Sequence, residues 1–380
     1  MDLVKMDHSE EAEPVIQDPS PMQYAFFGNA STGSLERFAR LLGKELERAG
    51  FTFGDGDPRD ANLVLSLVEP DEAKPFRRGA RGTYVLAVFE RPEHPEPIEE
   101  SLRADYPMLL RALANLVLDY VPGEGAWFTT MERGHYGVVG DSEEELARKV
   151  IERLVPLASS RLIIDNEFRT DLEPELWKGD EITGSIREAG VRLGALNLLP
   201  NPFPIEDLLT ERELRHVKRL YGIGGLSYGN LSARKDETRF WMSASGVDKT
   251  KLDVPGRDIL LVSDYDTANG RMVLSVPPDV EPRRVSVDAI EHWMIYQEHP
   301  GVGAIVHVHA WVDGIEATDV NYPCGTEELA RSVAELVRAE DDPDNAIVGL
   351  RNHGITVTGP SLEEILDRIE PRVLAEIPMS

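Results

Sequence analysis

Short apolar runs of strand length alternate with segments of helical periodicity through the first 160 residues, and this alternation restricts the fold more than any other feature. Strands alternating with helices are typical of layered α/β domains. We therefore expect residues 22–160 to form a Rossmann-like or flavodoxin-like layered domain, whose role the sequence does not indicate. The predicted strands are 24–28, 62–68, 83–89, 126–131 and 136–139, and the predicted helices are 35–48, 103–118 and 142–157.

The second half of the chain follows an irregular stretch that contains the motif LPNPFP at residues 199–204. Clustered prolines interrupt regular structure, which places the domain junction here. We expect an acidic disordered tail over 1–21, a linker over 161–207 and a second domain over 208–380. The predicted helices of this half are 210–221, 286–298, 327–339 and 361–374, and its predicted strands are 231–233, 239–243, 259–263, 303–309, 346–350 and 355–357.

Length, charge and cysteine content limit the functions that the chain can have. A chain of 380 residues exceeds one typical core, in agreement with two domains. The formal net charge of −28 repels nucleic acid and anionic membrane surfaces, and no apolar run has the length of a transmembrane helix. The chain has a single cysteine, Cys324, which fits a reducing compartment. We expect a cytoplasmic protein without nucleic-acid or membrane partners.

Three of the nine histidines occupy positions that suit a metal site. His307 and His309 lie in the apolar run AIVHVHA, and residues i and i+2 of a strand face the same side. His353 lies in RNHGI, directly after another predicted strand. Three imidazoles with an open fourth position form the ligand set of catalytic zinc. The alternative for the HxH pair alone is two half-buried histidines that hydrogen-bond to the backbone.

Six motifs in one order carry a family resemblance. They are YGNLSAR at 228–234, SASGVDK at 243–249, SVDAIEH at 286–292, IVHVHA at 305–310, YPCGTEELA at 322–330 and NHGITVTG at 352–359. In this order they resemble the class II aldolase/adducin superfamily, over roughly residues 208–375. The resemblance implies an αβα domain with a mainly antiparallel central sheet, a homo-tetramer, and His307, His309 and His353 as ligands of Zn²⁺ or of another divalent metal such as Mn²⁺.

The resemblance also implies roles for residues before the HxH strand. Asp288 matches the family's catalytic carboxylate, as a proton-transfer residue or a fourth ligand; a solvated aspartate in the first turn of a helix is the alternative. The substrate or anion pocket matches a set of glycines and short polar side chains, to which Lys249 adds a charge. The set is Gly229, Asn230, Ser245, Gly246 and Ser286. Ordinary turns explain such dipeptides equally well.

The chain departs from the family pattern at several positions. Val287 replaces a serine of the sugar-phosphate enzymes, and no tyrosine aligns with the catalytic tyrosine of the aldolases. Despite these departures, the resemblance implies a metal-dependent lyase of the aldehyde-lyase type, in carbohydrate metabolism, that acts on a small hydroxy-carbonyl or sugar (phosphate) substrate through an enediolate. An epimerase, dehydratase or decarboxylase on the same site is an alternative. A non-catalytic, adducin-like assembly module is another.

Overall fold

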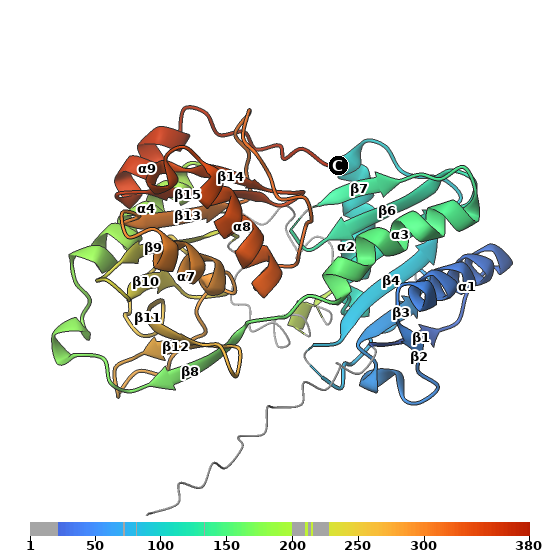
Figure 1. Ribbon diagram of the computed structural model, residues 1–380, viewed down its shortest axis with the longest axis horizontal. Helices are drawn as coiled ribbons and strands as arrows, with labels where there is room; N and C mark the ends of the chain where they lie inside the picture. Colours follow the sequence, from blue (N-terminus) through green and yellow to red (C-terminus); the bar gives the residue numbers. More distant parts are fainter. Residues whose placement is uncertain are drawn as a thin grey trace, which may run out of the picture.

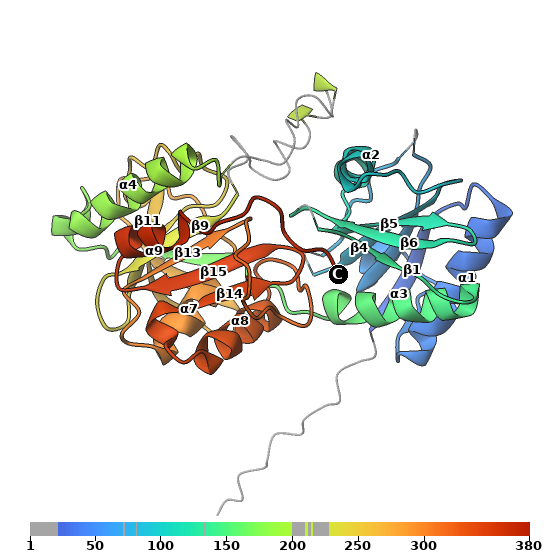
Figure 2. The ribbon, with the colours of Figure 1, turned by 90° about the horizontal axis from the view of Figure 1, so that it is seen from above.

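The chain forms two lobes that lie side by side, each built on one β-sheet (Figures 1 and 2). The computed structural model describes residues 22–70, 73–80, 82–132, 134–199, 210–211, 214–215 and 228–380. The predicted tail over 1–21 and most of the predicted helix over 210–221 lie outside these residues. Among the described helices, none is long and apolar enough to cross a membrane.

The first sheet has seven strands in the order β2-β1-β3-β4-β5-β6-β7. The first five pair in parallel, and β6 and β7 add an antiparallel edge. Helices α1 and α3 cover one face and α2 covers the other (Figure 2), so the central strands are buried on both faces and are mainly apolar. The elements are β1 (Gln23–Gly28), α1 (Gly33–Arg48), β2 (Thr52–Phe53), the 3-10 helix η1 (Pro58–Asp60), β3 (Leu63–Leu67), β4 (Tyr84–Glu90), α2 (Ile98–Ala112), β5 (Leu116–Val121), β6 (Gly125–Thr130), β7 (His135–Val138) and α3 (Glu143–Ala158).

The predicted helix over 103–118 is wrong in its second half. Helix α2 ends at Ala112, and the following apolar residues form β5 in the middle of the sheet. Leu113 has a φ of 56°, the left-handed conformation that terminates helices. The run from 108 to 118 is mostly apolar on both sides of the helix end, and periodicity alone does not separate a buried helix from a buried strand.

The turn between β1 and α1 is closed by a carboxylate. Thr32 caps α1, and its hydroxyl accepts a hydrogen bond from the Leu35 N–H. The Thr32 and Ser34 hydroxyls both donate to Oε2 of Glu90, at 2.6 Å each. A negative side chain therefore already lies at this helix N-terminus, where a phosphate would otherwise be favoured.

The second sheet has eight strands in the order β14-β15-β13-β9-β10-β11-β12-β8, antiparallel except for the β12–β8 pair. Helices α7 and α8 cover one face, and α4 and α9 cover the other (Figure 2). This is the mainly antiparallel, three-layer arrangement that the family resemblance implies. The elements not yet given bounds are β8 (Asp165–Arg169), the 3-10 helix η2 (Pro174–Leu176), α4 (Glu181–Ala195), β9 (Asn230–Arg234), β10 (Phe240–Ser243), β11 (Ile259–Asp266), β12 (Arg271–Ser275), α7 (Ala289–Glu298), β13 (Ala304–Val308), α8 (Glu327–Ala339), the 3-10 helix η3 (Pro343–Asn345), β14 (Ile347–Leu350), β15 (Gly354–Gly359) and α9 (Leu362–Ile369).

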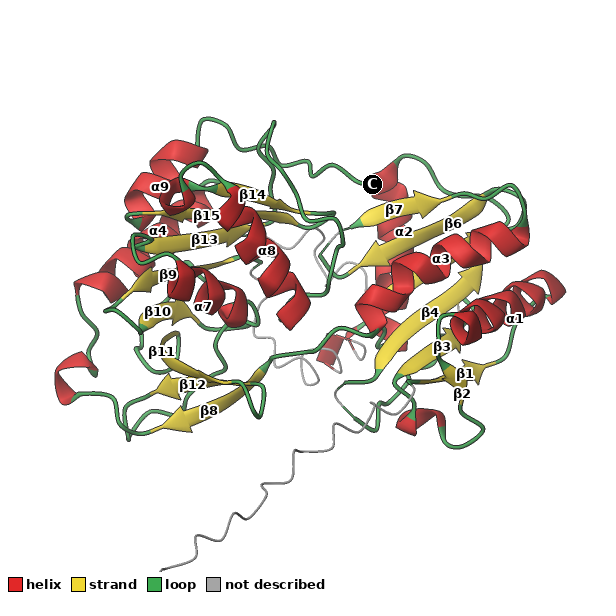
Figure 3. Ribbon diagram, in the orientation of Figure 1, coloured by secondary structure: helices red, strands yellow, loops and turns green. Residues whose placement is uncertain are grey.

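Part of the segment predicted as an irregular linker is regular and belongs to the second lobe. Strand β8 pairs with β12 at the edge of the second sheet (Figure 3). Helix α4 buries Ile186, Ala189 and Leu193 in the core of the same lobe. The sequence of β8, DNEFR, is an edge strand with charged side chains, so it lacks the apolar signal by which strands are recognised.

Candidate metal centre

The three histidines singled out in the sequence lie together at one end of the second sheet. His307 lies on β13, His309 follows the end of that strand, and His353 lies in the turn between β14 and β15. The antiparallel pairing of β13 with β15 brings the start of β15 to the end of β13. One ligand atom of each imidazole lies within 4.8 Å of the other two, and Nε2 of His353 is 3.1 Å from Nε2 of His309.

The turn that carries His353 depends on the asparagine before this histidine and the glycine after it. Asn352 has a φ of 57°, in the left-handed region that asparagine tolerates better than most residues. A Cβ at Gly354 would lie 2.3 Å from the carbonyl oxygen of Val308, so only glycine lets the two strands approach here. This close approach places the His353 ring against the end of β13.

The nitrogen set fits a first-row divalent cation. His307 is 1% exposed, and within the described residues its Nε2 has no hydrogen-bond partner. A buried polar atom without a partner is costly unless another group binds it. Burial lowers the pKa of His307 to about 4 and that of His353 well below its usual value. Both rings are therefore neutral near pH 7, the form that binds metals.

Asp288 lies next to this set, at the residue that precedes α7, and is 6% exposed. Its Oδ2 accepts a 2.7 Å hydrogen bond from the side-chain amide of Asn230. Burial, reinforced by the negative charge of Glu132, raises its pKa. The potential ligand atoms that lie within 4.8 Å of one another come from the three histidines, and in the described structure that group does not include Asp288.

A second buried carboxylate, Glu291, lies one turn further along α7. Its Oε1 accepts a 2.6 Å hydrogen bond from the Thr356 hydroxyl, which also lies 3.4 Å from Nδ1 of His307. Burial and the Asp288 charge raise its pKa. The sequence analysis did not single out this residue, because a glutamate inside a predicted helix is usually solvated.

The predicted anion-pocket residues gather beside the same strands. Gly229 has a φ of 72°, and a Cβ there would lie 2.6 Å from the His307 carbonyl oxygen. The segments before Ser245 and Ser286 run antiparallel, since the Ser286 N–H donates to the Ser243 carbonyl and the Ser245 N–H donates to the Arg284 carbonyl. Gly246 follows with a φ of 67°.

Lys249 comes from the turn after β10 and is only 2% exposed. Burial lowers its pKa to about 8, against the opposing effect of the Asp288 charge. Its positive charge in turn helps to lower the pKa of His307. The lysine is therefore within electrostatic reach of both the carboxylate and the triad.

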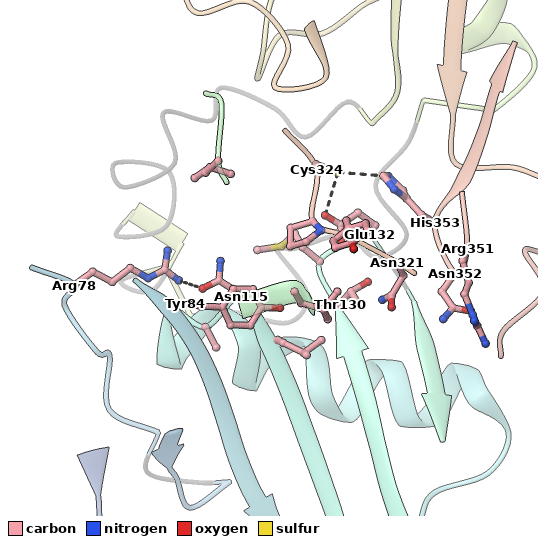
Figure 4. Close-up of a pocket in the computed structure, with 17 residues that line it drawn as sticks. Arg78, Tyr84, Asn115, Thr130, Glu132, Asn321, Cys324, Arg351, Asn352 and His353 are labelled. Atoms are coloured by element: carbon pink, nitrogen blue, oxygen red, sulfur yellow. Dashed lines mark hydrogen bonds between the residues drawn. The ribbon is translucent and has the colours of Figure 1, made fainter. Parts of the chain in front are cut away.

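The first lobe reaches the site through the turn between β6 and β7, which the sequence analysis did not identify. The Cys324 thiol donates to Oε1 of Glu132 at 3.3 Å and lies 3.5 Å from Nε2 of His353 (Figure 4). Burial, reinforced by the negative charge of Glu132, raises the pKa of Cys324 well above its usual value. The thiol therefore stays protonated and is a poor nucleophile.

A cavity of about 170 Å³ lies between the lobes beside these residues. Its walls include Arg78, Tyr84 and Asn115 of the first lobe and Asn321 and His353 of the second (Figure 4). An engineered cavity of about 150 Å³ holds benzene, so this one has the size of a small metabolite.

The second half of the chain is similar in sequence to known proteins. The family model described as Class II Aldolase and Adducin N-terminal domain matches residues 214–312 and 314–371. A methylthioribulose-1-phosphate dehydratase of Leptospira biflexa is 28% identical over 161 residues, which cover 39% of this chain and 71% of the relative. A 3-oxo-tetronate 4-phosphate decarboxylase of Haemophilus influenzae is 26% identical over 186 residues, 43% of this chain and 81% of the relative.

Two solved structures are similar at lower identity. An L-fuculose 1-phosphate aldolase is 20% identical with a TM-score of 0.35, covering 50% of this chain and 81% of its own. The N-terminal class II aldolase domain of a conserved Thermoplasma acidophilum protein is 16% identical with a TM-score of 0.33, covering 53% and 94%. No family model matches the first half of the chain. The family match and the ordered motifs show that the second half of this chain, over residues 214–371, is similar to the class II aldolase and adducin family.

Proposed function

We propose that this protein is a divalent-metal-dependent lyase of the class II aldolase type that acts on a small hydroxy-carbonyl compound. The observation that carries the proposal is the convergence of His307, His309 and His353, with their ligand atoms within 4.8 Å of one another. A divalent cation held there would polarise the carbonyl and hydroxyl oxygens of a substrate and stabilise the charge that follows loss of a proton.

Asp288 is the proposed proton-transfer residue of this reaction. Its Oδ2 is held by Asn230, and Oδ1 has no hydrogen-bond partner within the described residues. A carboxylate that is fixed on one oxygen and available on the other suits the exchange of a proton with a substrate carbon. Lys249 supports the ionised form of Asp288, since its positive charge lowers the pKa of this carboxyl group.

A dehydratase or decarboxylase is the second candidate. Two relatives of the family half carry the names methylthioribulose-1-phosphate dehydratase and 3-oxo-tetronate 4-phosphate decarboxylase. Cleavage of a carbon–carbon or carbon–oxygen bond next to a polarised carbonyl needs the same metal site and a nearby proton-transfer group. These reactions therefore differ in the substrate rather than in the triad. The predicted phosphate subsite comprises Gly229, Asn230, Ser245, Gly246 and Ser286, and we infer that it holds the anionic end of the substrate.

We infer Zn²⁺, or alternatively Mn²⁺, as the metal, a homo-tetrameric assembly and a cytoplasmic location. The strand order β2-β1-β3-β4-β5 supports a flavodoxin-like first domain over 22–160. Because β8 already pairs with the second sheet, we place the start of the second domain near Asp165.

The first test is the metal content of the purified protein, with His353→Ala as the site variant and His299→Ala as the control. His299 ends α7 outside the triad. About one divalent ion per chain in the wild type and the control, lost in His353→Ala, is the expected result. A companion assay follows deuterium uptake from solvent into dihydroxyacetone by proton NMR. A wild type that binds no metal, even with excess ion, would support a non-catalytic assembly module instead.

A further inference from the structure

The turn between β6 and β7 of the first lobe is held firmly against the metal centre. The hydroxyls of Tyr106 and Tyr228 are hydrogen-bonded to each other at 2.8 Å, and they lie 3.2 and 3.3 Å from the carbonyl oxygen of Met131, to which one of them donates. The Tyr228 ring in turn packs on His309, with 4.8 Å between the ring centroids. This chain of contacts links the turn in the first lobe to one histidine of the triad.

The other side of the same turn contacts the loop that carries His353. A Cβ at Gly134 would lie 2.8 Å from the Asn352 carbonyl oxygen, so the two backbones touch. The Asn321 amide donates a 2.8 Å hydrogen bond to the Tyr136 hydroxyl just beyond the turn. Glu132 lies between these two sets of contacts, and its position relative to His353 is therefore set by both lobes.

We propose that Glu132 binds a hydroxyl group of the substrate, so that the first lobe completes the substrate pocket of the second. This inference rests on the proposed metal-dependent reaction and narrows its substrate class. The substrate is a small hydroxy-carbonyl compound with at least one hydroxyl besides the two oxygens that would bind the cation. Glu132 is then a specificity-determining residue that lies in the first lobe, outside the residues that match the family model.

The chemistry of the pocket supports a hydroxyl rather than an anion at this position. An ionised carboxylate only accepts hydrogen bonds, and its two oxygens have about four acceptor sites. The Cys324 thiol, a weak donor, occupies part of this capacity at Oε1. The Glu132 charge already raises the pKa of Asp288, so a further negative group here would be repelled. A substrate hydroxyl gains a charge-assisted hydrogen bond instead.

The test compares two chelators that differ in one hydroxyl group. Glycolohydroxamate and acetohydroxamate offer the same pair of oxygens to a cation, but only glycolohydroxamate has an additional hydroxyl. Their dissociation constants are measured by calorimetry with zinc-loaded wild type, Glu132→Gln and the control Glu124→Gln. Glu124 is exposed in the turn between β5 and β6, at the opposite end of β6 from Glu132.

The wild type and Glu124→Gln should prefer glycolohydroxamate about tenfold or more, the value expected for a hydrogen bond to a charged group. Glu132→Gln should lose most of this preference while it binds acetohydroxamate as the wild type does. Equal preference in Glu132→Gln and the wild type would overturn the inference, as would equal weakening of both chelators. If the zinc-treated wild type holds no zinc and binds neither chelator, the metal site itself is wrong, and this inference fails with it.

Discussion

The side-chain amide of Asn230 donates a 2.7 Å hydrogen bond to Oδ2 of Asp288 and thereby ties the start of β9 to the residue before α7. Asp288 is not among the groups whose ligand atoms cluster with the three histidines in the described structure. We therefore expect Asp288→Asn to retain about one metal ion per chain, because its contribution is to proton transfer and not to ligation.

Elemental analysis and a chelator competition check this expectation for Asp288. Deuterium uptake into dihydroxyacetone should fall at least about a hundredfold in Asp288→Asn, since general acid–base catalysis contributes about 10²- to 10⁴-fold. Asn230→Ala should produce a smaller loss with metal retained. Loss of the metal in Asp288→Asn would instead identify this residue as a fourth ligand.

The HxH pair permits a sharper test of the ligand assignment than a single substitution. Changing both His307 and His309 to Ala removes two of three nitrogens, and one imidazole does not hold a divalent ion in a three-histidine site. We expect metal content near zero with an unchanged far-ultraviolet circular dichroism spectrum. A double variant that still holds one ion per chain would place the metal elsewhere.

Gly229 provides a test of the backbone that supports the triad. Gly229→Ala would bring a Cβ to 2.6 Å from the His307 carbonyl oxygen, in a backbone with positive φ. We expect the free energy of unfolding to fall by about 2 to 4 kcal/mol, because steric overlap adds to the conformational strain. Metal affinity should fall as well, since His307 must move.

Gly314→Ala is the matched control for this substitution. Gly314 also has a positive φ, 78°, but a Cβ there meets nothing within 4 Å. This variant should show the conformational cost alone, about 1 kcal/mol, with normal metal content. Equal destabilisation of the two variants, measured by thermal unfolding, would show that the contact with His307 contributes little.

The triad was predictable because its determinants are local. Alternation along a strand places His307 and His309 on one side, and an asparagine–glycine pair marks the turn at His353. The position of Glu132 was not predictable in this way. It depends on how two lobes pack against each other, and no spacing in the sequence encodes a contact between residues 192 positions apart.

The errors in the fold have similar physical causes. The sequence analysis merged β5 with α2, because the run is mostly apolar and only a short turn at the left-handed Leu113 separates them. Strand β8 was missed because its side chains are charged at the sheet edge. By contrast, α1 and α3 were predicted well, since Thr32 and Ser142 provide hydroxyl caps at the start of strongly periodic segments.

A buried group of charged residues in the first lobe makes its stability depend on pH. Asp119 on β5 is fully buried, and its carboxylate has no hydrogen-bond partner within the described residues. The Arg91 guanidinium lies close to it, with Nε at 3.6 Å, and Nδ1 of His94 lies at 3.8 Å. Burial and the charge of Asp105 raise the pKa of Asp119 to about 7. His135, whose pKa burial lowers to about 4, faces the same group.

The raised pKa of Asp119 predicts a loss of stability as pH rises. The folded state keeps the proton up to about pH 7, whereas the unfolded chain releases it near pH 4, so this stabilisation is complete below pH 4 and is lost as pH rises through 7. Between pH 5 and 8, the free energy of unfolding of the wild type should therefore fall by about 1 to 3 kcal/mol relative to Asp119→Asn.

His135 has the opposite effect on stability, since its contribution is lost as pH falls below 6.5. Because His135 is present in both proteins, its effect cancels in the difference between them. Denaturant unfolding can be followed through Trp127, which stacks on His94. Parallel pH profiles for the two proteins would show that Asp119 ionises at the same pH whether the chain is folded or not.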